Sequence, residues 1–145
     1  MYKHILMPSD GTALSEAAIL RGMRFAREAH AKVTGFYALP EFHALAYHTA
    51  MLEHTRKSQE DQARARAEEV LNYIRETAAQ YSVPCDTLTS ISDHPYEAII
   101  DAAHAQGCDL ILMASHGRRG LQGILLGSET LKVLTHSKIP VLVHR

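Results

Sequence analysis

The sequence has no surplus of charge, no long apolar run and no closely spaced cysteine pair. Its 15 basic and 16 acidic side chains leave a formal net charge of -1, so we expect no general attraction to nucleic acid or to an anionic membrane. No apolar run approaches the roughly 20 residues that span a bilayer, and Pro8 interrupts the apolar N-terminus too early for a signal peptide. Cys85 and Cys108 lack a Cys-x-x-Cys spacing, which suits a reducing compartment. These absences predict a cytoplasmic protein that binds neither nucleic acid nor membranes.

The length and composition are those of an ordinary globular protein. The chain has 145 residues, of which 46% are hydrophobic and 21% are charged, whereas a disordered chain has fewer apolar and more charged residues. The chain contains neither internal repeats nor a linker-like segment. We therefore expect residues 1–145 to form a single domain.

Short apolar runs typical of strands alternate along the chain with apolar residues at helical spacing. The expected strands cover residues 5–7, 33–39, 83–91, 110–113 and 139–143. The expected helices cover residues 13–30, a long segment that follows residue 52 and ends near 81, residues 95–107 and a short segment from 128. Residues 41–52 show no clear period and are predicted to form a mobile loop. This alternation is typical of an α/β fold in three layers, with an open parallel sheet of five strands and helices on both faces.

The last expected strand contains Pro140, which cannot donate a hydrogen bond to a neighbouring strand. We therefore expect this strand to lie at an edge of the sheet. Because an exposed apolar edge tends to pair with another chain, we predict a homodimer through this strand, from Ile139 to Val143. The alternative is an edge that is covered by loops of the same chain.

The segment most indicative of chemistry runs from Met113 to Ser128, after a buried strand and up to the start of a helix. Gly127 allows a ligand to approach the backbone closely, and the unpaired amides of the helix that begins at Ser128 favour an anion such as phosphate. The chain has no Walker A loop, and no Gly-x-Gly-x-x-Gly follows its first strand. Ser128 can instead be a simple helix cap.

The spacing of this segment resembles the C-terminal signature of the universal stress protein family, which is Gly-x-x-Gly, nine residues, then Gly-Ser/Thr. The chain has Ala114-Ser115-His116-Gly117, nine residues, then Gly127-Ser128. The run Pro8-Ser9-Asp10-Gly11-Thr12 resembles the family's first-strand signature, and Lys138-Ile139-Pro140-Val141-Leu142-Val143 its last strand. The resemblance covers the whole chain, with alanine at position 114 where the family has its first glycine.

The resemblance implies the sheet order 3-2-1-4-5, as in folds like that of the adenine nucleotide alpha hydrolases. In this order a crevice opens at the carboxyl ends of the first and fourth strands, where open α/β sheets bind ligands. By analogy with nucleotide-binding members, the crevice would hold ATP, alone or with Mg²⁺. The implied contacts are Asp10 and Ala38 with the adenosine, Met113 and Ala114 on the ribose side, and Gly117, Gly127, Ser128 and Glu129 with the phosphates. Further candidates are their neighbours Pro8, Ser115, His116, Arg118 and Thr130.

Several candidate residues also have simpler interpretations. Asp10 can be a turn residue before Gly11, and His116 an exposed loop histidine. The spacing of His43, His48 and His54 matches no zinc site, and we expect no metal site there. No paired nucleophile and base is evident, so no catalytic residue is predicted.

The function that the resemblance implies is a stress-response protein that binds an adenine nucleotide and acts as a switch on an unidentified protein partner. One alternative is a nucleotide-free, dimeric interaction protein of the same fold, in which Ala114 is the disabling change. Another is a slow ATP hydrolase. An enzyme that cleaves between the α and β phosphates is disfavoured, because a Ser-Gly-Gly-rich loop is missing after the first strand.

Overall fold

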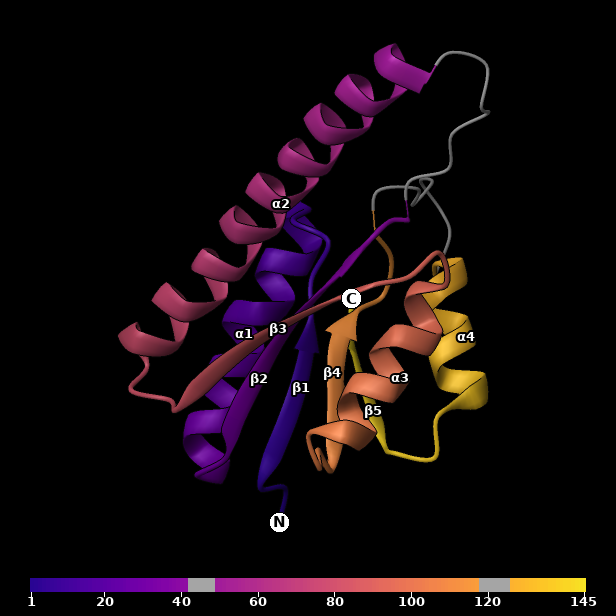
Figure 1. Cartoon of the computed structure of the whole chain (residues 1–145). Helices are drawn as coiled ribbons and strands as arrows, with labels where there is room; N and C mark the ends of the chain where they lie inside the picture. The colour runs from indigo at the N-terminus through magenta and orange to yellow at the C-terminus, as the bar shows by residue number, and fades with distance from the viewer. Residues whose placement is uncertain (42–48, 118–125) are drawn as a thin grey trace.

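The computed structural model describes residues 1–41, 49–117 and 126–145. Its centre is a parallel sheet of five strands: β1 (His4–Pro8), β2 (Lys32–Leu39), β3 (Cys85–Ile91), β4 (Leu110–Ala114) and β5 (Val141–His144). The strands lie side by side in the order β3-β2-β1-β4-β5 (Figure 1). This confirms the predicted strand order, and it places β1 and β4 next to each other.

In the described ranges, four helices cover the two faces of the sheet: α1 (Ala13–Ala29), α2 (Thr49–Gln80), α3 (Pro95–Ala105) and α4 (Ser128–His136). Helices α1 and α2 lie on one face, and α3 and α4 lie on the other (Figure 1). The molecule therefore has the three layers that the sequence predicts.

The core forms on both faces of the sheet because neighbouring side chains of a strand point to opposite faces. In β1, Ile5 and Met7 pack under α1 and α2, whereas Leu6 packs with residues of α3 and α4. All five residues of β1 and all five of β4 are buried, as expected for central strands of a parallel sheet. Gly35 in β2 allows α2 to lie close, because a Cβ there would be 2.7 Å from Ile74 Cγ2.

Two expectations about the middle of the chain need correction. The predicted loop at 41–52 is wrong for residues 49–52, which form the first turn of α2, while residues 42–48 lie outside the described residues. In the adjoining turns of this helix, residues 53–62 are all exposed, so this part of α2 needs no apolar period. The third strand begins at Cys85 rather than at residue 83.

The last strand lies at an edge of the sheet, as predicted, but its bounds differ. Ile139 and Pro140 precede β5, which runs from Val141 to His144. The carbonyl of Pro140 accepts a hydrogen bond of 2.9 Å from the Ile111 amide, so the proline ends the turn that leads into the strand. Among the helices that the structure describes, none is long and apolar enough to cross a membrane.

Candidate functional site

Asp10 stands at the turn between β1 and α1 and holds that turn together. Its Oδ1 atom accepts hydrogen bonds from the Thr12 amide at 3.0 Å, from Thr12 Oγ1 at 2.7 Å and from Ser15 Oγ at 2.7 Å. Gly11 adopts a φ of +80°, a left-handed conformation that favours glycine. One carboxylate oxygen of Asp10 thus orders the N-terminus of α1, as a turn residue would.

The second carboxylate oxygen of Asp10 faces Gly117, which follows β4. A Cβ built on Gly117 would lie 2.1 Å from Asp10 Oδ2, so only glycine lets the two turns come this close. The pairing of β1 with β4, which matches Ile5 with Leu110, explains how these sequence-distant turns meet. The structure therefore brings Asp10 and Gly117 together, just beyond the carboxyl ends of β1 and β4.

Gly127 joins the start of α4 to the end of β4. Its amide donates a hydrogen bond of 2.7 Å to the Ser115 carbonyl, and a Cβ on Gly127 would lie 3.0 Å from His116 Cα. Thr130 Oγ1 donates a bond of 2.9 Å to the Ala114 carbonyl. These two bonds fix the N-terminus of α4 beside the turn that carries Gly117.

The residue before α4, its N-cap, is Gly127, which provides no side-chain hydrogen bond to the helix. Ser128 is the first residue of the helix and is exposed. The alternative in which Ser128 caps α4 is therefore wrong. Because no side chain of the N-cap residue bonds the first amides of α4, an external acceptor can bond them, and the helix dipole favours an anion there.

Ala114 and Met113 are neighbours in β4 whose side chains pack on opposite faces of the sheet. Ala114 is 6% exposed and packs with the α1 and α2 core, whereas Met113 packs with the α3 and α4 core. The φ of Ala114 is not positive, since the described non-glycine residues with positive φ are His30 and Ser82. The methyl group of Ala114 thus lies in the core without backbone strain.

Glu129 makes its hydrogen bonds to α3 and α4. Its Oε2 accepts a hydrogen bond of 2.9 Å from the Tyr96 amide in the first turn of α3, and its Oε1 lies 3.4 Å from Lys132 Nζ. Because His94, the residue before α3, provides no side-chain cap, Glu129 acts as the cap of that helix. This carboxylate has a structural task besides any contact with a ligand.

The remaining predicted residues lie around this centre. Pro8 ends β1 and is buried, and Ala38 in β2 is half-buried on the face of α3 and α4. Ser115 is buried; its amide donates to the His144 carbonyl at 2.7 Å, and its hydroxyl lies 3.2 Å from His116 Nδ1. Arg118 lies outside the described residues.

One residue near this centre was missed by sequence reasoning. Arg66 of α2 donates a hydrogen bond of 3.5 Å to the Asp10 carbonyl, and its Nη2 would lie 3.3 Å from a Cβ on Gly11. It brings a guanidinium group to the end of β1. Arginines alternate with alanines over residues 63–67, and no local pattern distinguishes Arg66 from its exposed neighbours. Across the described parts of the chain, no three metal-ligating side chains gather in one place.

The sequence profile of the universal stress protein family matches residues 1–145. The chain belongs to the universal stress protein family. Universal stress protein MJ0531 of Methanocaldococcus jannaschii is 28% identical over 143 residues, which span 99% of this chain and 82% of the relative. The glycine spacing and the first-strand signature thus identified the family correctly.

Solved members of the family share the fold of this chain. UspA from Lactobacillus plantarum is 26% identical and superimposes with a TM-score of 0.84, covering 99% of this chain and 98% of its own. Protein MJ0577 is 27% identical with a TM-score of 0.82, over 99% of this chain and 95% of its own. A more distant member, 20% identical with a TM-score of 0.74, was solved in complex with cAMP. Another, from Archaeoglobus fulgidus, is 16% identical with a TM-score of 0.74 and was solved in complex with dAMP. They cover 99% of this chain and 97% and 98% of their own.

Proposed function

We propose that this universal stress protein binds ATP or another adenine nucleotide at the carboxyl ends of β1 and β4. The observation that carries the proposal is the contact of Asp10 with Gly117, next to the uncapped start of α4 at Gly127. It combines two glycine-lined turns with a helix terminus that favours phosphate. The position is also the switch point of the sheet, where open α/β folds bind ligands.

In the proposed complex, the adenosine lies along Asp10 and Ala38, and the phosphates lie against Gly117, Gly127 and Ser128. The relatives solved with cAMP and with dAMP support an adenine nucleotide as the ligand class for the fold. At their identities to this chain the likeness is one of fold, so the residues named here rest on this chain's own geometry.

The donors present suit the nucleotide better than they suit a magnesium ion held by the protein. Backbone amides suit the phosphates, and the glycines allow the phosphates to come close to them. Glu129, in contrast, already bonds the Tyr96 amide and Lys132. Mg²⁺ usually needs one or two carboxylates besides the phosphates. We therefore propose that any Mg²⁺ arrives on the phosphates and that Glu129 stays on α3.

We further propose that the protein works as a homodimeric, cytoplasmic switch. Strand β5 lies at a sheet edge and exposes 37% of Leu142, which supports pairing of two copies there. Nucleotide occupancy would change the segments 41–52 and 118–126, which adjoin the ends of β2 and β4, and so alter a surface for a protein partner. Amide hydrogen exchange of these segments, with and without saturating ATP, tests the switch; unchanged exchange contradicts it.

Calorimetric titration with ATP tests the binding itself. Gly127→Glu and Ser128→Glu each place a negative charge where the phosphates would lie, and we expect both to abolish detectable binding. Ser128→Glu keeps the backbone of Gly127, so it covers the case in which the first variant misfolds. Gln106→Glu adds the same charge just before β4, near the amino ends of the strands, and serves as the control. Gln106 is exposed. Full affinity in Ser128→Glu would contradict the phosphate placement.

A nucleotide-free interaction protein is the second candidate function, and one observation favours it. Asp10 Oδ1 already accepts bonds from Thr12 and Ser15, so that oxygen of the site is satisfied without a ligand. If titration of the folded, unmodified protein with ATP produces no heat of binding, this candidate is favoured over the first.

A further inference from the structure

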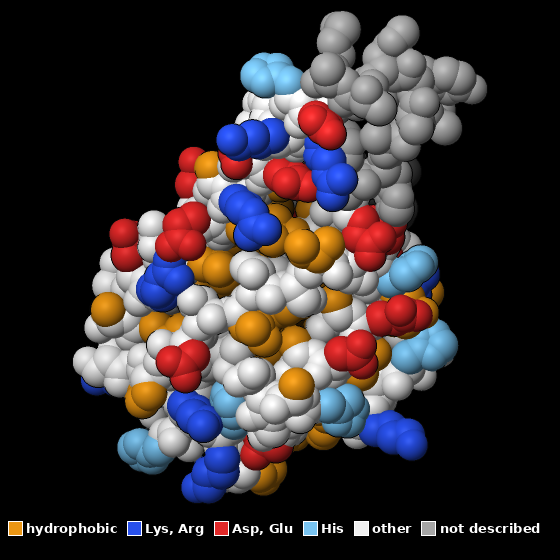
Figure 2. Space-filling model, in the orientation of Figure 1, with side chains coloured by type: hydrophobic (Ala, Val, Ile, Leu, Met, Phe, Trp, Pro, Cys, Tyr) orange, Lys and Arg blue, Asp and Glu red, His pale blue; other side chains and the backbone are white. Residues whose placement is uncertain are grey.

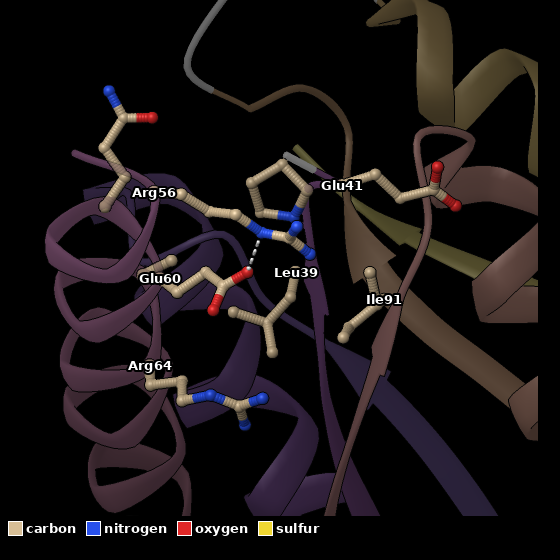
Figure 3. A pocket seen from close by; sticks show the side chains of 9 residues that line it. Leu39, Glu41, Arg56, Glu60, Arg64 and Ile91 are labelled. Carbon is tan, nitrogen blue, oxygen red and sulfur yellow. Dashed lines mark hydrogen bonds and ion pairs between the residues drawn. The ribbon is translucent and has the colours of Figure 1, made fainter. Parts of the chain in front are cut away.

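A pocket of about 390 Å³ lies between α2 and the carboxyl ends of β2 and β3 (Figure 3). Its lining comes from Leu39 and the residues that follow it, from one face of α2 between Arg56 and Arg64, and from Ile91 at the end of β3. We call it the α2–β3 pocket. It lies on the side of β2 away from β4, and its lining includes none of the residues proposed to contact the nucleotide. Its volume falls in the range of small-molecule sites.

The pocket exists because the N-terminal half of α2 leaves the sheet. Ala67 is the first fully buried residue of α2 whose side chain the structure describes, and residues 53–62 are all exposed. Figure 1 shows this half of the helix rising past the ends of the strands. The hollow beside it therefore lies between this helix, which has 32 residues, and the ends of two strands.

The floor of the α2–β3 pocket is apolar. It combines Leu39 and Ala63 with Ile91, whose side chain is 58% exposed. Among the large hydrophobic side chains that the structure describes, only Met1 is more exposed. Figure 2 shows hydrophobic side chains in the middle of this face, with charged side chains around them. An exposed apolar surface rimmed by polar groups commonly marks a binding site.

The rim of the pocket carries Arg56, Arg64, Glu41 and Glu60, and among the described residues Arg64 has no ion-pair partner. Arg56 Nε and Glu60 Oε1 form an ion pair of 2.9 Å. Arg64 lies one turn further along α2 and extends toward the strands (Figure 3), and no carboxylate lies within ion-pair distance of it among the described residues. The carboxylate of Glu41 points away from the pocket (Figure 3).

We infer that the α2–β3 pocket binds a small organic anion with an apolar body. The body lies on Leu39, Ala63 and Ile91, and the anionic group accepts hydrogen bonds from the Arg64 guanidinium. Arginine suits this role because its planar group binds a carboxylate through two parallel bonds. A neutral ligand would make no charge-assisted hydrogen bond with Arg64, and the Arg64 guanidinium would repel a cation placed beside it. This site goes beyond the proposed nucleotide site.

Two naphthalene probes of equal size test the inference. 2-Naphthoate carries a carboxylate, and 2-naphthalenemethanol carries a neutral hydroxymethyl group. We expect naphthoate to bind about five- to tenfold more tightly, because a partly exposed charged hydrogen bond contributes modestly. Methyl NMR signals of Leu39 and Ile91 should shift on titration. Equal affinities, no binding, or shifts confined to residues near Gly127 would each overturn the inference.

Arg64→Gln supplies the matched variant, since it removes the charge and keeps a polar side chain. It should lose the preference for naphthoate and leave binding of the neutral probe unchanged. Arg24→Gln, at an exposed position of α1, is the control and should change neither affinity. An unchanged preference in Arg64→Gln would overturn the inference. Ser128→Glu, which tests nucleotide binding, should leave naphthoate binding intact, so the two proposals can fail separately; loss of naphthoate binding in it would contradict a separate site.

Discussion

Gly117→Ala tests the closest approach in the candidate nucleotide site. The added Cβ would lie 2.1 Å from Asp10 Oδ2, whereas real Cβ contacts stay beyond about 3.0 Å. Asp10 cannot simply rotate away, because its Oδ1 is held by Thr12 and Ser15. The two turns must therefore separate, or these hydrogen bonds must lengthen.

The expected cost follows from two opposing effects. Overpacking of this kind costs about 1–3 kcal/mol, while replacing glycine by alanine restricts the unfolded chain and returns about 0.4–1 kcal/mol. We expect the free energy of unfolding to fall by about 1–2 kcal/mol. Because the separation displaces Asp10 from the crevice, ATP affinity should fall as well.

Urea denaturation followed by circular dichroism measures the stability, and calorimetry measures the affinity. Asp10→Ala removes the oxygen that the new methyl group would meet, so Gly117→Ala should be neutral or slightly stabilising in that background. The resulting double-mutant cycle isolates the contact from the other effects of each change. Additive effects of the two substitutions, or full stability in Gly117→Ala alone, would refute the close approach.

Three further predictions concern residues outside that contact. Burial lowers the pKa of His4, which is 7% exposed. The unfolded chain therefore binds a proton more readily than the folded protein, and the free energy of unfolding should fall as the pH drops below about 6.5. His4→Gln should reduce this pH dependence, as urea midpoints at pH 7.5 and 5.5 can measure. Glu129→Ala should lower the free energy of unfolding by about 1 kcal/mol through the lost bond to the Tyr96 amide, and Glu129→Gln should restore most of it; equal losses in both variants would contradict the capping role. Gly35→Ala should lower the free energy of unfolding by about 1–3 kcal/mol, because the new methyl group meets Ile74. Ile74→Ala should be less destabilising in the Gly35→Ala variant than in the unmodified protein, as thermal melts can measure.

The local patterns of the chain were enough to predict most of its helices and strands. Apolar runs and helical spacing depend on neighbours within a few residues, so the strands and most of the helices follow from sequence. The start of α2 could not be predicted in this way, because residues 53–62 are exposed and carry no apolar period. The strand order came from the family resemblance, and the pairing of β1 with β4 confirms it.

The roles of individual side chains in the candidate site depended on contacts between distant segments. Sequence alone could not predict that Glu129 turns to the Tyr96 amide, or that Arg66 reaches the Asp10 carbonyl. It also could not decide whether a methyl group at Ala114 faces the ligand or the core. Each outcome depends on which helix covers which face of the sheet.

The amino-acid sequence by itself determined the alternation of strands and helices, the family, and the two glycine-containing turns. These properties are local, since they arise from backbone preferences and from the spacing of apolar side chains. The tertiary structure alone decided that Asp10 meets Gly117, that Gly127 leaves α4 uncapped beside them, and that α2 leaves a pocket next to Ile91. Such contacts require the chain to bring remote backbone segments within a few ångströms, which sheet order and helix packing control.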